Sequence, residues 1–254
     1  MKDLSLTGSA EQEERKMEKV NEVLAGISRF QQETTKKKDL MQTLGNGRPV
    51  FTEEERIRVK EKLKEIEARE RFFKERKIEQ FIKDFIGVHY LRNFDEKRIR
   101  DKDKLDKKIN NMFDTGRGII LFGDVGVGKT TDLIYIIKRI YKEQRDYNDR
   151  DNPDIPISFY FMRNLFNILH QGGKATIRKY VILDDWGREY ATDFSFSQFE
   201  GFIEEIYSRE IRLVITTNLT KEQLINREGW LRITDRVREM CSMLEIPGRS
   251  MRHK

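Results

Sequence analysis

The spacing of apolar residues changes near residue 90 of this 254-residue chain. Before that point Glu, Lys and Arg dominate, and the sparse apolar residues recur every three or four positions, as on one face of a helix. The first stripe comprises Met17, Val20, Leu24 and Ile27, and the second comprises Val59, Leu63, Ile66 and Phe73. The second predicted helix opens at Thr52, where Thr52 and Glu55 match a capping box, and closes at Gly87. Residues 1–87 are therefore predicted to be a charged helical region. It forms a hairpin or a helix that docks on a partner, or else a helix packed on its own domain.

Short, continuous apolar runs alternate with helical patterns after residue 90. The runs at 118–122, 157–162, 180–183 and 212–216 are typical of buried strands. Helical patterns follow the first run and cover 165–170, 194–209 and a stretch from about Trp230. Strands that are apolar throughout and alternate with helices form a parallel sheet covered on both faces. We therefore predict an α/β domain over residues 88–254.

Composition narrows the possible functions only modestly. Lys and Arg number 50 against 44 Asp and Glu, an excess that permits contact with nucleic acid phosphates but equally fits the solvated surface of a long charged helix. The single cysteine, Cys241, excludes an internal disulfide, and no Cys/His cluster has metal-ligand spacing. No apolar run has the length of a membrane span or a signal peptide, so we expect a cytoplasmic protein without membrane contact.

A phosphate-binding motif lies between the first predicted strand and the helix after it. It consists of Gly123, Asp124, Val125, Gly126, Val127, Gly128, Lys129 and Thr130, which match G-x-x-x-x-G-K-T, and Thr131, which follows the motif, is expected to join it in binding. Glycines let backbone N–H groups approach phosphate oxygens, and the following helix presents its N-terminus to the same anion. In such P-loops the lysine reaches the β- and γ-phosphates and the next hydroxyl is a ligand of Mg²⁺. The motif predicts that ATP or ADP binds here with Mg²⁺, through Lys129 and Thr130.

Two later strands of the predicted sheet end in polar side chains. Asp184 and Asp185 follow one strand, and Asn218 follows the next. Because ligands bind at the carboxyl ends of parallel strands, we expect Asp184 to hold Mg²⁺ through water and Asp185 to orient the attacking water. The alternative is that acidic residues simply cap a strand end. Asn218 is expected to contact the γ-phosphate or the water as a sensor, or else to cap the helix that opens at Lys221.

The ordered motifs resemble a known family. After the P-loop come VILDDWG, VITTNLT, ITDRVREM and IPGRSMR, and over residues 88–254 this series resembles the AAA+ ATPases of the bacterial helicase-loader group (DnaC/DnaI-like) and the neighbouring IstB-like transposition-helper ATPases. The resemblance implies ATP hydrolysis and an ATP-dependent homo-oligomer. Hydrolysis would be slow, because Asp185 is shorter than the glutamate that many AAA+ proteins carry at this position. It also implies that Arg236 is an arginine finger acting on the next subunit's nucleotide, and that Arg252 is a second sensor acting in its own subunit. The residues alone favour a surface arginine at 236, paired with Asp235 or Glu239.

The resemblance predicts a protein that loads a replicative helicase onto single-stranded DNA. This chain lacks the cysteine-rich zinc module that some loaders carry, so the N-terminal helices would have to bind the helicase. Two alternatives stay open. One is a transposition-helper ATPase that binds duplex DNA and a transposase. The other is a nucleotide-gated adaptor with little turnover.

Overall fold

The computed structural model describes residues 53–143, 156–187, 192–226 and 229–251. The chain separates into two compact units, Met1–Lys77 and Ile78–Lys254. The predicted stripe at 17–27 and the Thr52 capping box lie outside the described residues. Helix α2 spans Glu53–Phe85 and continues from the first unit into the second.

The division between the units falls within α2, whereas the sequence predicted a boundary at 87/88. The last turns of α2 carry Ile78, Phe81 and Ile82, which are buried together with Ile86 in the core of the second unit. The end of this helix is thus part of the α/β unit. Its apolar residues become denser over this stretch, which is the sequence signal for the change.

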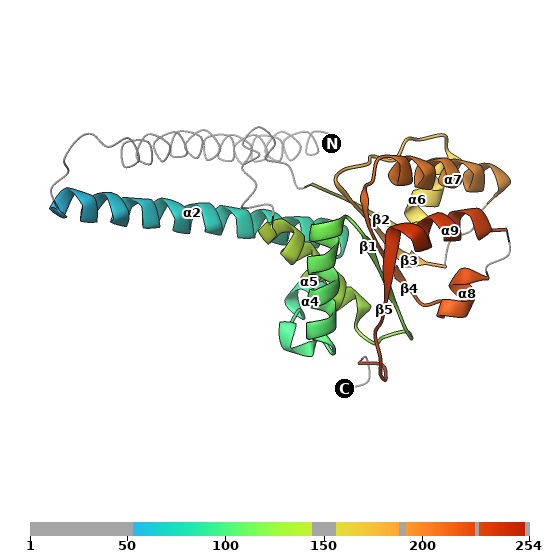
Figure 1. The fold of residues 1–254 in the computed structure, drawn as a ribbon, viewed down its shortest axis with the longest axis horizontal. Coiled ribbons are helices and arrows are strands. Elements are labelled where there is room, and N and C mark those ends of the chain that lie inside the picture. Colours follow the sequence, from blue (N-terminus) through green and yellow to red (C-terminus); the bar gives the residue numbers. More distant parts are fainter. Residues whose placement is uncertain (1–52, 144–155, 188–191, 227–228, 252–254) are drawn as a thin grey trace, which may run out of the picture. The chain divides into compact units, whose positions relative to one another are not determined.

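Among the described residues, five strands form one parallel sheet in the second unit (Figure 1). They are β1 (Gly118–Phe122), β2 (Ile157–Phe161), β3 (Tyr180–Trp186), β4 (Arg212–Thr217) and β5 (Cys241–Glu245). The order is β2-β3-β4-β1-β5, so β4 lies between the strand that precedes the P-loop and the strand that ends in the acidic pair. The predicted α/β class with a parallel sheet is confirmed.

Helices cover both faces of the sheet. The longer ones are α4 (Lys102–Thr115), α5 (Lys129–Glu143), α6 (Met162–His170), α7 (Asp193–Ser208) and α9 (Leu231–Met240). The shorter ones are α3 (Val88–Arg92), the 3-10 helix η1 (Glu96–Arg98) and α8 (Lys221–Ile225). Because side chains alternate along a strand, Ile119 and Leu121 pack with α4, α5 and the end of α2, while Ile120 packs with α6, α7 and α9.

Four elements of the second unit were not predicted from the sequence, namely the short α3 and η1, helix α4 and strand β5. The stretch after Trp230 was interpreted as helical, but the helix ends at Met240, and β5 follows without an intervening turn. This edge strand is short and only Cys241 and Leu244 in it are buried, so its apolar pattern is weak. Helix α4 does carry a readable pattern, because its buried Leu105, Ile109 and Met112 follow helical spacing.

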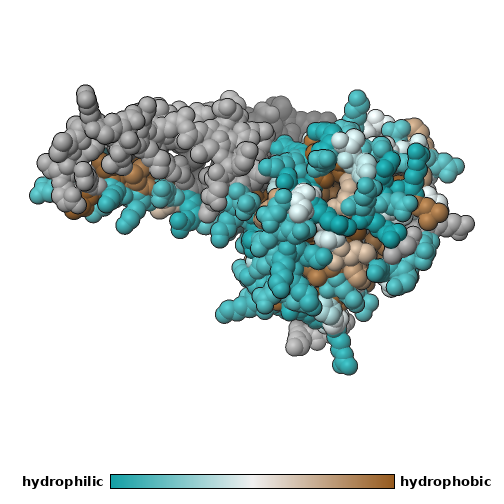
Figure 2. All heavy atoms as spheres, in the orientation of Figure 1, coloured by the Kyte–Doolittle hydropathy of each residue, from teal (hydrophilic) through white to brown (hydrophobic). Residues whose placement is uncertain are grey.

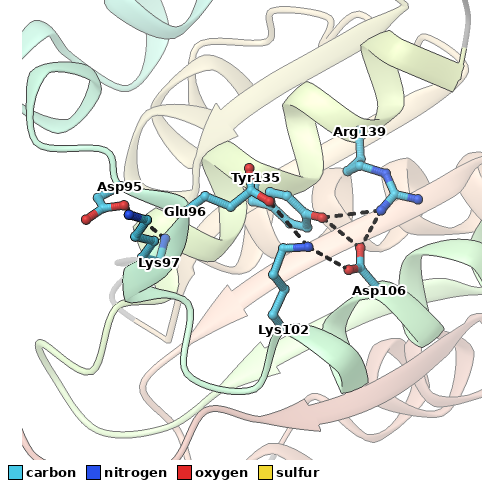
Figure 3. Close-up of polar contacts among 7 residues, drawn as sticks. All are labelled: Asp95, Glu96, Lys97, Lys102, Asp106, Tyr135 and Arg139. Carbon is cyan, nitrogen blue, oxygen red and sulfur yellow. Dashed lines mark hydrogen bonds and ion pairs between the residues drawn. The ribbon is translucent and has the colours of Figure 1, made fainter.

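A polar cluster joins α4 to α5 (Figure 3). The Asp106 carboxylate accepts hydrogen bonds from Tyr135 Oη (2.8 Å), from Lys102 Nζ (3.1 Å) and from the Arg139 guanidinium. Burial alone would raise the pKa of Asp106, but these hydrogen bonds and the two positive charges lower it below its ordinary value. The cluster therefore fixes α4 against the helix whose first residue is Lys129.

The surface agrees with the polar composition. Figure 2 shows a described surface covered mostly by hydrophilic side chains, with apolar ones in smaller islands between them. Within the described part of the chain, no helix has both the length and the apolar character needed to cross a membrane.

Candidate nucleotide-binding site

The P-loop joins β1 to α5 in a conformation that needs glycine. Gly123 has φ 149° and Gly128 has φ 114°, values that side chains rarely permit. A Cβ atom on Gly123 would lie 2.6 Å from the Ile246 carbonyl oxygen, and one on Gly128 would overlap the Met251 side chain. The positive φ excludes larger residues at both positions and the Ile246 backbone excludes them at Gly123 as well, so the chain can turn tightly into the N-terminus of α5.

Lys129 lies over the loop that precedes it. Its side chain is 8% exposed, and Nζ donates hydrogen bonds to the carbonyl oxygens of Gly123 (2.7 Å) and Asp124 (2.8 Å). Thr130 and Thr131 follow in the first turn of α5 and are partly buried. The ammonium group is thus positioned by the backbone of the loop itself.

The end of β3 holds the acidic pair in an irregular backbone. The pairing with β4 shifts by one residue between Leu183 and Trp186, and Asp185 takes a left-handed conformation with φ 61°. The Thr216 hydroxyl on β4 donates to the buried Asp184 carboxylate and accepts the Asp185 backbone N–H at 3.0 Å. Thr216 therefore fixes both acidic residues. Thr216 was not among the predicted site residues, although its place two positions before Asn218 at a strand end was a usable signal.

Asn218 is directed toward the acidic pair. Its Nδ2 atom lies 3.4 Å from Asp185 Oδ1. Helix α8 is capped instead by Thr220, whose hydroxyl accepts the Gln223 backbone N–H while Gln223 binds back to the Thr220 backbone. The capping role considered for Asn218 thus belongs to Thr220.

Buried charge gives the site unusual pKa values. Burial raises the pKa of Asp184 to about 6, and the Asp185 charge adds to this, whereas the Thr216 hydrogen bond and the Lys129 charge act in the other direction. Burial also raises the pKa of Asp132, in the first turn of α5, to about 7, opposed by the charges of Arg100 and Lys129. The buried Asp184 carboxylate and the Thr130 hydroxyl together form a set of oxygen donors that suits Mg²⁺.

The segment after β5 lies against the P-loop. The Ile246 N–H donates to the Phe122 carbonyl and the Met251 N–H to the Gly126 carbonyl, both at 2.8 Å. Arg100 holds this segment, because its guanidinium donates to the carbonyl oxygens of Pro247 and Arg249. The Arg100 contacts join residues 147 and 149 positions apart, so no local pattern could have predicted them. Arg252, the predicted second sensor, lies outside the described residues.

Arg236 lies on α9, and its side chain binds residues of α7. Its Nε and Nη2 atoms donate to the two carboxylate oxygens of Glu204 at 3.0 and 3.2 Å. Its guanidinium carbon lies 4.3 Å from the centre of the Tyr207 ring. Glu239 instead accepts a hydrogen bond from Tyr207, and Asp235 pairs with Arg238 at 3.7 Å. Arg236 is thus paired, but with neither of the partners considered from the sequence.

These features define an α/β protein with a P-loop after its first strand. The structure brings the P-loop, Asp184, Asp185 and Asn218 to the carboxyl ends of β1, β3 and β4, three adjacent strands. Thr217 strengthens this edge, because its hydroxyl donates to the Trp186 carbonyl at 2.7 Å. The arrangement matches the edge at which parallel sheets bind ligands.

Comparison with known proteins gives likeness only in structure. No family model matches the sequence, and no curated protein does. The crystal structure of the DnaC helicase loader is similar, with 21% identity, a TM-score of 0.46, and 58% of this chain and 90% of the other covered. A putative primosome component from Streptococcus pyogenes has 16% identity and a TM-score of 0.48, covering 63% and 90%. AMPPCP-bound DnaA from Aquifex aeolicus has 14% identity and a TM-score of 0.44, covering 57% and 46%.

Proposed function

We propose that this protein binds and hydrolyses ATP and uses it to load a replicative helicase onto single-stranded DNA. The observation that supports ATP chemistry is the meeting of the P-loop, Asp184, Asp185 and Asn218 at one edge of the sheet. The loading role rests on the ordered motifs that resemble the helicase-loader group.

Each residue then has a distinct task. Lys129 and the loop N–H groups bind the phosphates, and Thr130 and Asp184 hold Mg²⁺, with Asp184 acting through water. Mg²⁺, when bound, neutralises charge on the transferred phosphoryl group. Asp185 orients the attacking water, and Asn218, whose Nδ2 lies 3.4 Å from the Asp185 carboxylate, acts beside it as the sensor of the γ-phosphate or that water. Thr216 positions both acidic residues without touching the substrate.

ATP binding and phosphate release, measured in one sample with and without Mg²⁺ and single-stranded DNA, test the enzymatic part. We expect slow Mg²⁺-dependent release that DNA stimulates. Tight binding without release would favour the nucleotide-gated adaptor, and failure to bind ATP would remove the proposal. A clear preference for duplex DNA would favour the transposition-helper alternative.

We propose further that Arg236 acts on the nucleotide of a neighbouring subunit. To do so it has to leave Glu204 and Tyr207, which hold it on α7 within its own subunit. The Arg236→Ala protein should bind ATP almost normally but hydrolyse it poorly, because a finger supplied in trans stabilises the transition state and not the bound substrate. Mixing it with Lys129→Ala protein should restore partial activity, because a mixed interface pairs an intact P-loop with an intact finger. ATPase rates across mixing ratios decide this. Inactive mixtures that light scattering shows to be co-assembled would leave Arg236 a surface residue.

The N-terminal region, residues 1–87, is proposed to bind the helicase. A pull-down of the host's replicative helicase by the full-length chain should therefore succeed. It should fail when the exposed surface of α2 is changed, for example by Ile57→Glu together with Phe72→Glu. Equal capture by the changed and unchanged proteins would place the helicase contact elsewhere.

A further inference from the structure

A groove with only positive and neutral lining lies beside the edge strand β5. It encloses about 690 Å³ and is formed by residues that the nucleotide site does not use. Its cations come from four places: Lys107 and Lys108 on α4, Arg117 before β1, Lys221 at the start of α8, and Arg238 on α9. Residues of β5 complete the lining. The fold thus brings five positive charges from distant parts of the sequence to one concave surface.

Most of this charge is not neutralised. Among the described residues, Lys107, Lys108 and Lys221 form no ion pair with a carboxylate, and no acidic residue lines the groove. Arg238 pairs with Asp235 at 3.7 Å, on an exposed part of α9. Like charges gathered in a concave surface repel one another and attract anions. Five such positive charges suit a chain of anions better than a single anion.

The lining also indicates which polyanion fits. Asn111 and Ser242 add neutral hydrogen-bonding groups, which together with Lys and Arg are the usual partners of nucleic acid phosphates. The groove has no aromatic lining residue on which a base could stack. An acidic protein segment normally also inserts an apolar anchor, and here only Met243 and the buried Cys241 are apolar. Of the polyanions that such a lining suits, single-stranded DNA is the one that the proposed function brings to this protein.

We propose that this groove binds the phosphate backbone of single-stranded DNA. The inference rests on the proposed function, to which it adds the surface that holds the strand. Binding through phosphates alone is insensitive to sequence and strongly dependent on salt. For a single strand, each neutralised phosphate adds about 0.7 to the slope of log K against log salt concentration.

The test compares two double variants of the full-length protein. Lys107→Gln with Lys108→Gln removes two charges from the groove, and Lys97→Gln with Lys142→Gln removes two exposed charges that do not line it. Fluorescence anisotropy with an oligothymidine is measured between 50 and 200 mM salt. The groove variant should bind about tenfold more weakly at the low end, and its salt slope should fall by about 1.4. The control should match the unchanged protein, and both variants should keep their ATP affinity, which shows that they fold.

Three further ligands sharpen the result. An abasic oligonucleotide should lose affinity as the oligothymidine does, because only phosphates are contacted, and a duplex of the same length should bind more weakly than the single strand. If the unchanged protein binds DNA and both variants bind it equally, the groove proposal is wrong while the proposed function stands. If the unchanged protein hydrolyses ATP but binds no DNA, the groove and the DNA-loading role both fall. If only polyglutamate binding is lost in the groove variant, the groove belongs to an acidic protein and the proposal is overturned.

Discussion

The nucleotide site and the basic groove both place lysines where phosphates are expected to bind, but in opposite surroundings. Lys129 is almost fully buried and is held by two carbonyl groups of the P-loop. Lys107 is exposed and Lys108 is half-buried on α4, and neither forms an ion pair with a carboxylate among the described residues. A buried, fixed cation is little screened by salt and favours one geometry. Cations at an open surface attract any phosphate chain and are more easily screened. The comparison predicts specific chemistry at one place and unspecific, salt-sensitive binding at the other.

Removing the buried cation should have the largest effect. In Lys129→Ala protein the phosphates lose the positive side chain that the loop directs at them. We expect hydrolysis to fall by at least about 10³-fold and ATP binding by more than tenfold. Phosphate release and nucleotide titration measure the two losses. Lys142→Ala, on the exposed end of the same helix, is the matched control. Unchanged turnover in Lys129→Ala would refute the assignment of the P-loop.

Asp185 separates binding from chemistry within the same site. Asp185→Asn should slow hydrolysis by about 100-fold because the attacking water is no longer oriented, while ATP affinity stays within about tenfold, or ~1.4 kcal/mol. Single-turnover rates and equilibrium binding are measured on the same protein, with the exposed Asp114→Asn as control. Equal losses in rate and affinity would make Asp185 a binding or structural residue.

Salt distinguishes the two regions directly. If four or five groove cations bind phosphates, raising salt from 50 to 200 mM should weaken single-stranded DNA binding by roughly 50–130-fold. ATP affinity at constant free Mg²⁺ should change less than about threefold, because buried charges are screened little. Parallel titrations of the unchanged protein check this. Equal salt responses would show that the two sites do not differ in the way that their burial implies.

The hydroxyl between the two acidic residues should have a smaller effect. Thr216→Val keeps the shape but leaves the buried Asp184 carboxylate without its donor, so we expect about a tenfold loss of hydrolysis and a loss of about 1–3 kcal/mol in the free energy of unfolding. Thr216→Ser, which restores the hydroxyl, should recover most of both. Denaturant unfolding measures the loss of stability, and ATPase rates measure the loss of hydrolysis. No recovery in the serine variant would mean that the methyl group matters instead.

Buried Asp132 predicts a modest dependence of stability on pH. Its pKa is about 7 in the folded protein because of burial, so between about pH 4 and 7 the folded state holds a proton that the unfolded state has lost. The contribution of this group to stability is therefore greatest at low pH, declines as pH rises to about 7, and is constant above it. Asp132→Asn should remove this dependence and stabilise the protein at pH 8 by about 1 kcal/mol or more. Urea unfolding from pH 5 to 8 measures it. An unchanged profile in the variant would assign the dependence to other groups.

Much of the sheet was predictable because its strands are short apolar runs bounded by turns and helices. The P-loop was predictable because its chemistry lies in consecutive residues, and the structure adds that Asp184, Asp185 and Asn218 meet at the same edge. The edge strand β5 was missed because only two of its five side chains are fully buried, so its apolar pattern is weak. Arg100 was missed because its partners, Pro247 and Arg249, are distant in sequence. Such contacts depend on the completed fold.

The burial of the last turns of α2 has a practical consequence for dissecting this chain. Ile78, Phe81, Ile82 and Ile86 lie in the core of the α/β unit, and at roughly 1.5–3 kcal/mol each their burial contributes about 6–12 kcal/mol. That is comparable to the whole stability of an ordinary domain. A fragment that starts at residue 88 would therefore lack part of its own core. The N-terminal region could be exchanged for another, by an experimenter or in evolution, only at a junction before residue 78.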